Sequence, residues 1–224
     1  MQAEDVGRNA LCLELERAAD AARAAGMAAY MRGKFVFLGI ATPQRRKICR
    51  PFFREAKQKE TIDWAFVAFC WEQAPREYQY VAVDYLRALK QFLAFDDLRE
   101  LQNLIQAKSW WDTVDSLSGL VGHLGLQYPG VDQVMLEWSG AEDIWLRRTA
   151  IILQLARKER LNTVLLEKIL SNNLAQTEFF INKAIGWILR DYSKTDPRWV
   201  QVFIEENKQR MAALSIREAG KYLD

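Results

Sequence analysis

The chain has 224 residues, half of them hydrophobic and 27% charged, with a net charge of +2. This composition is ordinary for a folded protein, and the length suffices for one large domain or a short repeat array. No apolar run approaches the roughly 20 residues that cross a bilayer, and the amino terminus lacks the apolar core of a secretory signal. The composition therefore excludes a membrane-spanning protein and predicts a cytoplasmic one.

The cysteines and the single histidine argue against a metal site. Cys12, Cys49 and Cys70 are odd in number and widely spaced, which favours reduced thiols over a disulfide framework or a zinc site. With His123 as the only histidine, no histidine-rich cluster can form, and the helical pattern around it predicts a solvated surface position. We therefore expect no bound metal.

Positive charge is concentrated in one segment. Residues 30 to 60 hold nine Lys or Arg against two Glu, a balance of +7, which leaves −5 for the rest of the chain. Arg45, Arg46 and Lys47 are consecutive within this segment. Such segregation suggests an anionic partner, although a solvated helix face explains the charge alone equally well.

The predicted elements are all helices. Hairpin signals are missing, since no Asn-Gly, Asp-Gly or Gly-Gly pair occurs. Helix starts are frequent instead, each marked by a proline near the first position and in two cases by a capping side chain before it: Thr42-Pro43, Pro75, Pro129 and Asp196-Pro197. Because no Ser/Gly-rich linker divides the chain, we expect a single all-α domain over 1–224.

A weak repeat runs through these helices. Trp110, Trp145 and Phe180 follow one another at intervals of 35 residues, each near the start of a helix, and Pro75 opens a similar unit 35 residues earlier. A period of this size built from helix pairs is typical of HEAT-like solenoids. The pattern predicts about six helix pairs with a concave basic face, although chance spacing of aromatics is an alternative.

The helix expected after Lys108 carries a candidate catalytic pair. Its apolar arc contains Trp110, Val114, Leu117, Leu120, Val121 and Leu124. Trp111 and Asp115 lie beside that arc, one turn apart. A carboxylate next to an aromatic wall suits the stabilisation of a sugar cation. The alternatives are an aspartate that caps the helix or pairs with an arginine, and a tryptophan that belongs to the core.

Two later helices supply candidate binding residues. The helix from Trp145 is apolar all round, so Arg148 must pair internally or emerge into a groove. In the helix from Phe179, a narrow arc of Ile181, Ile185, Ile188 and Tyr192 predicts the core face. The opposite arc holds Lys183, Trp187, Arg190 and Lys194, which suits contact with phosphate and sugar. Alternatively, the long basic side chains merely cover the tryptophan.

Motifs across nearly the whole chain resemble the bacterial AlkD-type DNA glycosylases. The resemblance rests on these strings: Tyr30-Met31, Phe37-Leu38-Gly39-Ile40, Thr42-Pro43, Lys108-Ser109-Trp110-Trp111-Asp112 with Val114-Asp115-Ser116, Ile144-Trp145-Leu146 with Arg148, Phe179-Phe180-Ile181 with Lys183-Ala184-Ile185-Gly186-Trp187, Leu189-Arg190, Lys194-Thr195 and Arg217-Glu218-Ala219. The combination of Trp-Trp-Asp-x-Val-Asp with Gly-Trp-x-Leu-Arg is specific to that family.

The resemblance implies a HEAT-like superhelix that excises N3- and N7-alkylated purines from duplex DNA without a cofactor. It places the catalytic cluster on Trp111, Asp115 and Trp187. The DNA-facing positions that it implies are Arg148, Tyr30, Thr42, Arg190 and Lys194, to which the charge pattern adds Lys183, Arg45, Arg46 and Lys47. One departure is visible: Ala156 stands where the family has a lysine, and Arg157 and Lys158 are candidate substitutes.

A single carboxylate is sufficient under this interpretation. An alkylated purine is already cationic and leaves as a neutral base, so Asp115 need only stabilise the oxocarbenium-like sugar and orient water. The resemblance further implies that the lesion stays in the base stack, and we expect a monomer. Two alternatives remain open: a non-catalytic scaffold that binds distorted DNA, and a protein-interaction solenoid.

Overall fold

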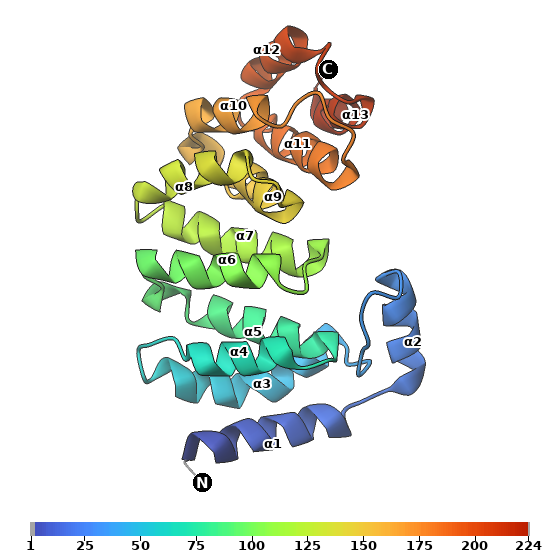
Figure 1. Cartoon of the computed structure of the whole chain (residues 1–224), viewed down its shortest axis with the longest axis vertical. Helices are drawn as coiled ribbons and strands as arrows, with labels where there is room; N and C mark the ends of the chain where they lie inside the picture. Colours follow the sequence, from blue (N-terminus) through green and yellow to red (C-terminus); the bar gives the residue numbers. More distant parts are fainter. Residues whose placement is uncertain (1–2, 224) are drawn as a thin grey trace. The chain divides into compact units, whose positions relative to one another are not determined.

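The protein is built from helices (Figure 1). A computed structural model describes residues 3–223, which form thirteen α-helices, four short 3₁₀ helices and one isolated β-bridge between Val36 and Pro75. The all-α class expected from the sequence is therefore confirmed. The chain divides into two compact units, Met1–Leu93 and Ala94–Asp224. A single domain over 1–224 stays a prediction.

The first unit contains five α-helices and one 3₁₀ helix. They are α1 (Ala3–Arg17), α2 (Ala21–Tyr30), α3 (Thr42–Lys57), α4 (Trp64–Glu72), α5 (Arg76–Ala88) and η1 (Lys90–Phe92). Helix α5 is central, because α3 and α4 both pack on it, while α1 packs on α3. Apolar side chains such as Phe66, Val81 and Leu86 fill the space between these helices and are almost completely buried.

A buried carboxylate fixes the loop that leads into α3. Glu77 accepts hydrogen bonds from the backbone N–H groups of Leu38, Gly39 and Ile40 at 2.9, 2.8 and 3.1 Å, so its charge is satisfied without water. Gly39 has φ +85°, and a Cβ there would lie 2.0 Å from the carbonyl oxygen of Asp20. Only glycine fits this position, and the start of α3 is held in place as a result.

The second unit contains eight α-helices. They are α6 (Leu98–Gln106), α7 (Trp111–Gly125), α8 (Gly130–Ser139), α9 (Ile144–Ile152), α10 (Thr163–Ser171), α11 (Phe179–Tyr192), α12 (Pro197–Asn207) and α13 (Ala213–Ala219), with the 3₁₀ helices η2 (Phe95–Asp97), η3 (Lys158–Arg160) and η4 (Gly220–Tyr222). They form the consecutive pairs α6–α7, α8–α9, α10–α11 and α12–α13.

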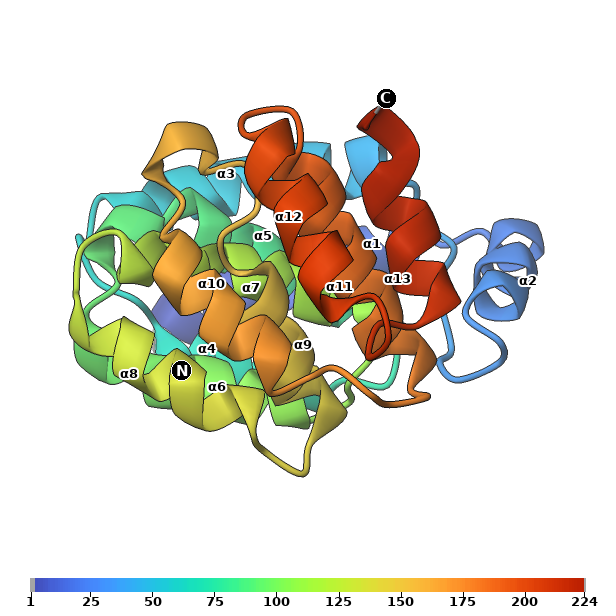
Figure 2. The ribbon, with the colours of Figure 1, turned by 90° about the horizontal axis from the view of Figure 1, so that it is seen from above.

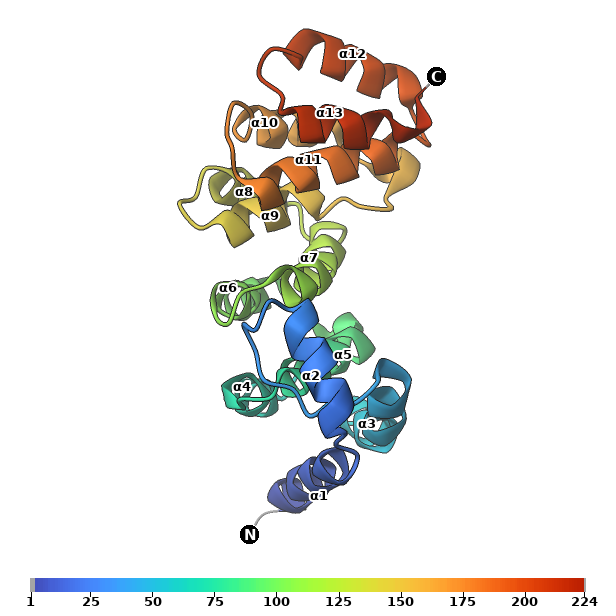
Figure 3. The ribbon, with the colours of Figure 1, turned by 90° about the vertical axis from the view of Figure 1, so that its right-hand side faces the viewer.

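Within this unit the second helices of the pairs form one layer. Helix α9 packs between α7 and α11, and α11 packs on α13, whereas α8 packs on α10 in a separate layer. Figure 2 shows α8 and α10 on one side of α9 and α11, and Figure 3 shows α9, α11 and α13 following one another. The layer α7–α9–α11–α13 carries all the candidate catalytic residues.

The predicted 35-residue period has a direct structural counterpart. Trp110, Trp145 and Phe180 pack against one another, with ring centroids 5.7, 5.0 and 5.0 Å apart. Arg157 also donates to the carbonyl of Gly122, 35 residues away. Equivalent positions meet because successive helix pairs stack with little rotation.

The helix starts agree with the sequence pattern except at α3. Asp196 caps α12 by accepting from the N–H of Trp199, as expected, and Pro75 and Pro129 occupy the N-cap positions of α5 and α8. At α3 the first helical hydrogen bond runs from Arg45 N to Ala41 O, so Ala41 is the N-cap. Thr42 is therefore the first helical residue, and its side chain is exposed rather than capping.

Candidate active site

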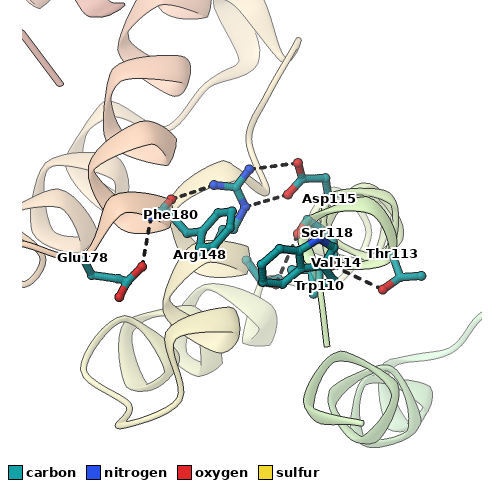
Figure 4. A network of polar contacts seen from close by, with 9 residues as sticks. Trp110, Thr113, Val114, Asp115, Ser118, Arg148, Glu178 and Phe180 are labelled. Atoms are coloured by element: carbon teal, nitrogen blue, oxygen red, sulfur yellow. Dashed lines mark hydrogen bonds and ion pairs between the residues drawn. The ribbon is translucent and has the colours of Figure 1, made fainter. Parts of the chain in front are cut away.

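Three helices of the second unit meet at one carboxylate–guanidinium pair (Figure 4). Arg148 on α9 donates from Nε and Nη2 to the two carboxylate oxygens of Asp115 on α7, at 2.7 and 2.8 Å. Its third donor, Nη1, binds the carbonyl oxygen of Phe180 at the start of α11 at 2.6 Å. The guanidinium thus links α7, α9 and α11 through a bidentate ion pair and one backbone contact.

The local sequence explains why this pair lies where it does. Helix α9 is buried on almost every side, so Arg148 has no route to solvent and is 4% exposed. Helix α7 buries Val114 and Leu117 in the core, which leaves Asp115 at the edge of the apolar face. A buried guanidinium requires a partner, and the carboxylate one repeat earlier in the chain supplies it.

Burial and pairing act in opposite directions on Asp115. Removal from water raises the pKa of the Asp115 carboxyl above its ordinary value, while the hydrogen bonds and charge of Arg148 oppose that rise. The Asp115 side chain keeps 19% of its surface accessible. A partly dehydrated carboxylate with an open side is suited to stabilise a cation that approaches from outside.

The three tryptophans near this pair differ in their roles. Trp110 is buried in the aromatic cluster with Trp145 and Phe180 and is therefore a core residue, as the apolar arc predicts. Trp111 lies one turn before Asp115 on α7, and Trp187 lies on α11; both are half-buried. That both indoles flank a sugar next to Asp115 stays a prediction.

The basic arc of α11 is less free than the sequence predicts. Lys183 and Arg190 both bind Glu218 of α13, at 2.9 and 2.7 Å, and Lys221 binds the same carboxylate at 3.0 Å. The hydrogen bonds from Lys183 and Lys221 lower the pKa of Glu218 to about 2. Lys194 is exposed and lies over the ring of Tyr222, 4.7 Å from its centroid. Lys183 and Arg190 are therefore held in position rather than mobile in solvent.

The candidate DNA-facing residues of the first unit divide into exposed and buried ones. Tyr30, Thr42 and Lys47 are exposed. Arg46 has a side chain that is 54% exposed although it binds Asp84.

Arg45 is a correction to the expected DNA contacts. It is 4% exposed, donates to Asp84 at 3.0 Å and lies over the ring of Tyr80. The side chain points from α3 toward α5, so Arg45 joins two helices within the unit. Arg148 departs from the same expectation, because all three of its contacts described above are internal.

The position that departs from the family motif has its own backbone contact. Ala156 has φ +61°, and its N–H donates to the Asp191 carboxylate at 2.7 Å. The guanidinium of Arg157, one of the two candidate substitutes, is bound to the Gly122 carbonyl at 2.8 Å, and burial lowers its pKa. Arg157 is thus half-buried and held by internal hydrogen bonds, whereas Lys158 is exposed.

Any other chemistry within residues 3–223 would have to come from the cysteines, the histidine or a cluster of acidic side chains. In that range no group of three or more His, Cys, Asp or Glu side chains is arranged to hold a metal ion. The three cysteines are free thiols, with Cys49 and Cys70 buried, and a ring nitrogen of His123 lies 3.0 Å from the Gln127 amide. No helix in this range is both long and apolar enough to span a membrane.

Sequence reasoning missed two organising carboxylates, Glu218 and Asp84. Glu218 binds three cations from α11 and the carboxyl-terminal segment, and Asp84 binds Arg45 and Arg46. Neither has a local sequence signal, because their partners lie 28 to 39 residues away except for Lys221. The resemblance had drawn attention to Glu218 only as part of an Arg-Glu-Ala string.

The stacked helix pairs define an α-helical repeat protein. Its layer of second helices carries the carboxylate of Asp115, which is partly accessible to solvent. A family model for DNA alkylation repair enzymes matches residues 11–223, and the chain belongs to that family. It is also similar to a solved structure described as a predicted DNA alkylation repair enzyme from Enterococcus faecalis. The two share 34% sequence identity with a TM-score of 0.84, over 92% of this chain and 96% of that one. None of the curated proteins compared matches the chain.

Proposed function

We propose that this member of the DNA alkylation repair family is a monofunctional DNA glycosylase. Its substrates are cationic N3- and N7-alkylated purines, such as 3-methyladenine and 7-methylguanine, in duplex DNA, and it acts without a cofactor in base excision repair. The observation that carries the proposal is the Asp115 carboxylate, buried enough to be poorly hydrated, oriented by Arg148 and still 19% accessible.

The chemistry requires little more than this carboxylate. When the C1′–N bond of an N3- or N7-alkylated purine breaks, its electron pair neutralises the positive base, so no general acid is needed. The sugar becomes an oxocarbenium-like cation, and a negative charge held nearby stabilises it. A water molecule then bonds to C1′ and loses one proton. Asp115 supplies the charge and orients the water.

Arg148 acts as a positioning residue. Its two parallel hydrogen bonds fix the plane of the Asp115 carboxylate, and its charge favours the ionised form that the reaction needs. Trp111 and Trp187 complete the site by flanking the deoxyribose, where their π faces favour the developing positive charge.

Affinity for DNA comes mainly from cations that contact phosphates. In the second unit these are Lys183, Arg190 and Lys194, and in the first unit Arg46 and Lys47, with Tyr30 and Thr42 as uncharged contacts. Because binding releases counterions, affinity falls steeply with salt. The protein acts as a monomer in the bacterial cytosol.

A base-release assay tests the proposal directly. DNA carrying 7-methylguanine is incubated with excess enzyme, and free base is measured over time. Wild-type protein should release base, and Asp115→Asn should lower the single-turnover rate by about 10² to 10³ while DNA affinity is retained, as expected for loss of an electrostatic stabiliser.

Asp132→Asn is a matched control. Asp132 is a half-buried carboxylate in the first turn of α8, in the same unit but outside the cluster, and its loss should leave the rate unchanged. An Asp115→Asn variant that works at the wild-type rate would overturn the catalytic role. DNA binding without any base release by the wild type would favour the non-catalytic scaffold instead.

A further inference from the structure

A pair of buried hydroxyl groups joins α7 to α9 next to the Asp115–Arg148 ion pair. Ser118 lies three residues after Asp115 on α7, and Thr149 follows Arg148 on α9. The hydroxyl oxygens of Ser118 and Thr149 are 3.2 Å apart and share a hydrogen bond, and the two residues are 1% and 0% exposed. Water therefore cannot replace this bond when the helices move apart.

Ser118 also connects the hydroxyl pair to the backbone beside Asp115. It donates to the carbonyl oxygen of Val114, the residue before Asp115, at 2.8 Å (Figure 4). The contact from α9 thus reaches the turn of α7 that carries the candidate catalytic carboxylate. Ser118 keeps the Val114 carbonyl as a partner even when the hydroxyl of Thr149 is removed.

The backbones of the two helices approach closely one turn further along α7. A Cβ on Gly122 would lie 2.3 Å from the carbonyl oxygen of Leu153, the residue after α9, so no side chain separates the backbones there. Asp115, Ser118 and Gly122 share one face of α7, because intervals of three and four residues are each close to one helical turn. The hydroxyl pair therefore lies between an ion pair and a tight backbone contact.

The hydroxyl pair is directional, whereas the apolar contacts around it are not. Hydrophobic packing depends on the area removed from water and has no preferred direction. A hydrogen bond between two buried hydroxyls is made in one register only, and a buried hydroxyl without a partner costs free energy. A small slide of α7 along α9 would break this bond and misalign the two parallel hydrogen bonds from Arg148 to Asp115.

We propose that Ser118 and Thr149 are positioning residues, whose hydrogen bond fixes the register of α7 on α9 and so orients the Asp115 carboxylate for the reaction. This inference rests on the proposed function, because it concerns the same site. It goes further, since two buried residues outside the cluster of Trp111, Asp115 and Trp187 become necessary for the full rate. Both act through Asp115 and Arg148, and neither touches the substrate.

Removal of the Thr149 hydroxyl tests the effect on the reaction. Thr149→Val nearly preserves the shape of the side chain, and it should lower the single-turnover rate of base release about 10- to 100-fold with DNA affinity retained, because a small displacement of a reacting group is costly. Thr149→Ser keeps the hydroxyl and should restore most of the rate. Thr113→Val is a matched control that removes another buried hydroxyl of α7, bonded to the Trp110 carbonyl, and should keep the wild-type rate.

The pKa of Asp115 reports its orientation in the free protein, without DNA or reaction. Burial raises this pKa most strongly and Asp112 of α7 adds to the rise, whereas Arg148 of α9 opposes it. Looser contacts with Arg148 in Thr149→Val should therefore raise the pKa of Asp115 further. Thr149→Ser and Thr113→Val should keep the wild-type pKa. A ¹³C NMR titration of the Asp115 carboxyl group measures it.

The double variant Ser118→Ala/Thr149→Val keeps the inference testable if a single variant folds poorly, because it leaves neither hydroxyl unpaired. Both substitutions break the same bond, so the double variant should be no slower than the slower single variant. Rate losses that add up would overturn the positioning role. An Asp115 pKa at or below the wild-type value in the folded Thr149→Val or double variant would also overturn it. Wild-type protein that releases no base, while Thr149→Val raises the pKa of Asp115, would leave the positioning role standing and remove the proposed reaction.

Discussion

Asp115 and Glu218 lie in the same unit and both bind an arginine, yet their pKa values move in opposite directions. Asp115 has one arginine, and burial raises its pKa. Glu218 has a side chain only 6% exposed and binds Lys183, Lys221 and Arg190, and the hydrogen bonds from the two lysines lower its pKa to about 2. Desolvation is the largest influence on the pKa of Asp115, whereas at Glu218 the hydrogen bonds from Lys183 and Lys221 outweigh desolvation.

Asp115 is the proposed catalytic carboxylate, whereas Glu218 is a structural one. The charge of Glu218 is saturated by the protein's own cations, so it has little to offer a substrate and instead sets the positions of Lys183 and Arg190. The charge of Asp115 is balanced by one arginine and costs free energy to keep buried. A cationic substrate that reaches Asp115 relieves part of that cost.

Removing the single partner of Asp115 should have the largest effect on stability. Arg148→Met leaves a buried charge uncompensated and should lower the free energy of unfolding at neutral pH by about 3 to 5 kcal/mol. The loss of Arg148 raises the pKa of Asp115 further, so the folded variant takes up a proton more readily than the unfolded chain. The deficit should therefore shrink as pH falls through that raised pKa, which urea unfolding at several pH values measures.

The double variant Asp115→Asn/Arg148→Met is the control for this prediction. Because it contains no buried charge, it should recover most of the lost stability. A double variant as unstable as Arg148→Met, or a deficit independent of pH, would show that lost packing is responsible.

The next largest effect on stability is expected at Gly186, where α13 lies close to α11. A Cβ at Gly186 would lie 2.5 Å from the Cβ of Glu218, so Gly186→Ala must displace α13 and should cost about 1 to 3 kcal/mol. Gly119→Ala is a matched control on a helix, because nothing lies within 4 Å of the added methyl group. It should be stabilising by about 0.5 to 1 kcal/mol. Similar effects of both substitutions in thermal unfolding would contradict the tight packing.

The pH dependence of base release tests whether the raised pKa of Asp115 affects the reaction. If ionised Asp115 is required, the single-turnover rate should fall about tenfold per pH unit below its pKa. Since burial raises that pKa, the acid limb should lie above the ordinary aspartate value of 3.8. The assay subtracts spontaneous depurination measured without enzyme. An acid limb at or below the ordinary value would contradict an important role for burial.

Neutralising Glu218 should have the smallest effect. Glu218→Gln loses charge-assisted contacts whose cations can turn to solvent, so we expect a loss of about 1 kcal/mol at neutral pH. A lowered pKa gives stability that is complete above the ordinary value of 4.5 and is lost as pH falls toward about 2. The stability gap between wild type and variant should close over that window in urea unfolding. Glu206→Gln, an exposed position on α12, should show no gap at any pH.

Much of the fold could be predicted from the sequence because its signals are local. The apolar arcs of α7 and α11 were identified correctly: Val114, Leu117, Ile181 and Ile185 are all buried. The recurrence of aromatic residues every 35 positions predicted a helix-pair repeat, and in the structure Trp110 and Trp145 pack against each other. Hydrophobic periodicity identifies the buried face of a helix. A fixed repeat interval identifies the residues at equivalent positions in neighbouring helix pairs, which pack against one another.

The ionic partners could not be predicted in the same way. Asp115 was recognised as a candidate from its place beside the apolar arc, and pairing with an arginine was an alternative, but the sequence did not identify Arg148 as the partner. Arg45 looked like its exposed neighbours Arg46 and Lys47, and only the packing of α3 on α5 buries it. The sequence around a charged residue does not identify its ion-pair partner.

The sequence by itself determined the helices, their buried faces and the repeat, because each depends on residues within a few turns or at a constant interval. The tertiary structure alone decided which cations are already bound and which remain available to an anion. That distinction depends mainly on side chains 28 to 39 residues apart that meet only when the helix pairs stack, as Arg148 meets Asp115. Long, flexible charged side chains have several possible partners in a sequence, and packing selects one of them.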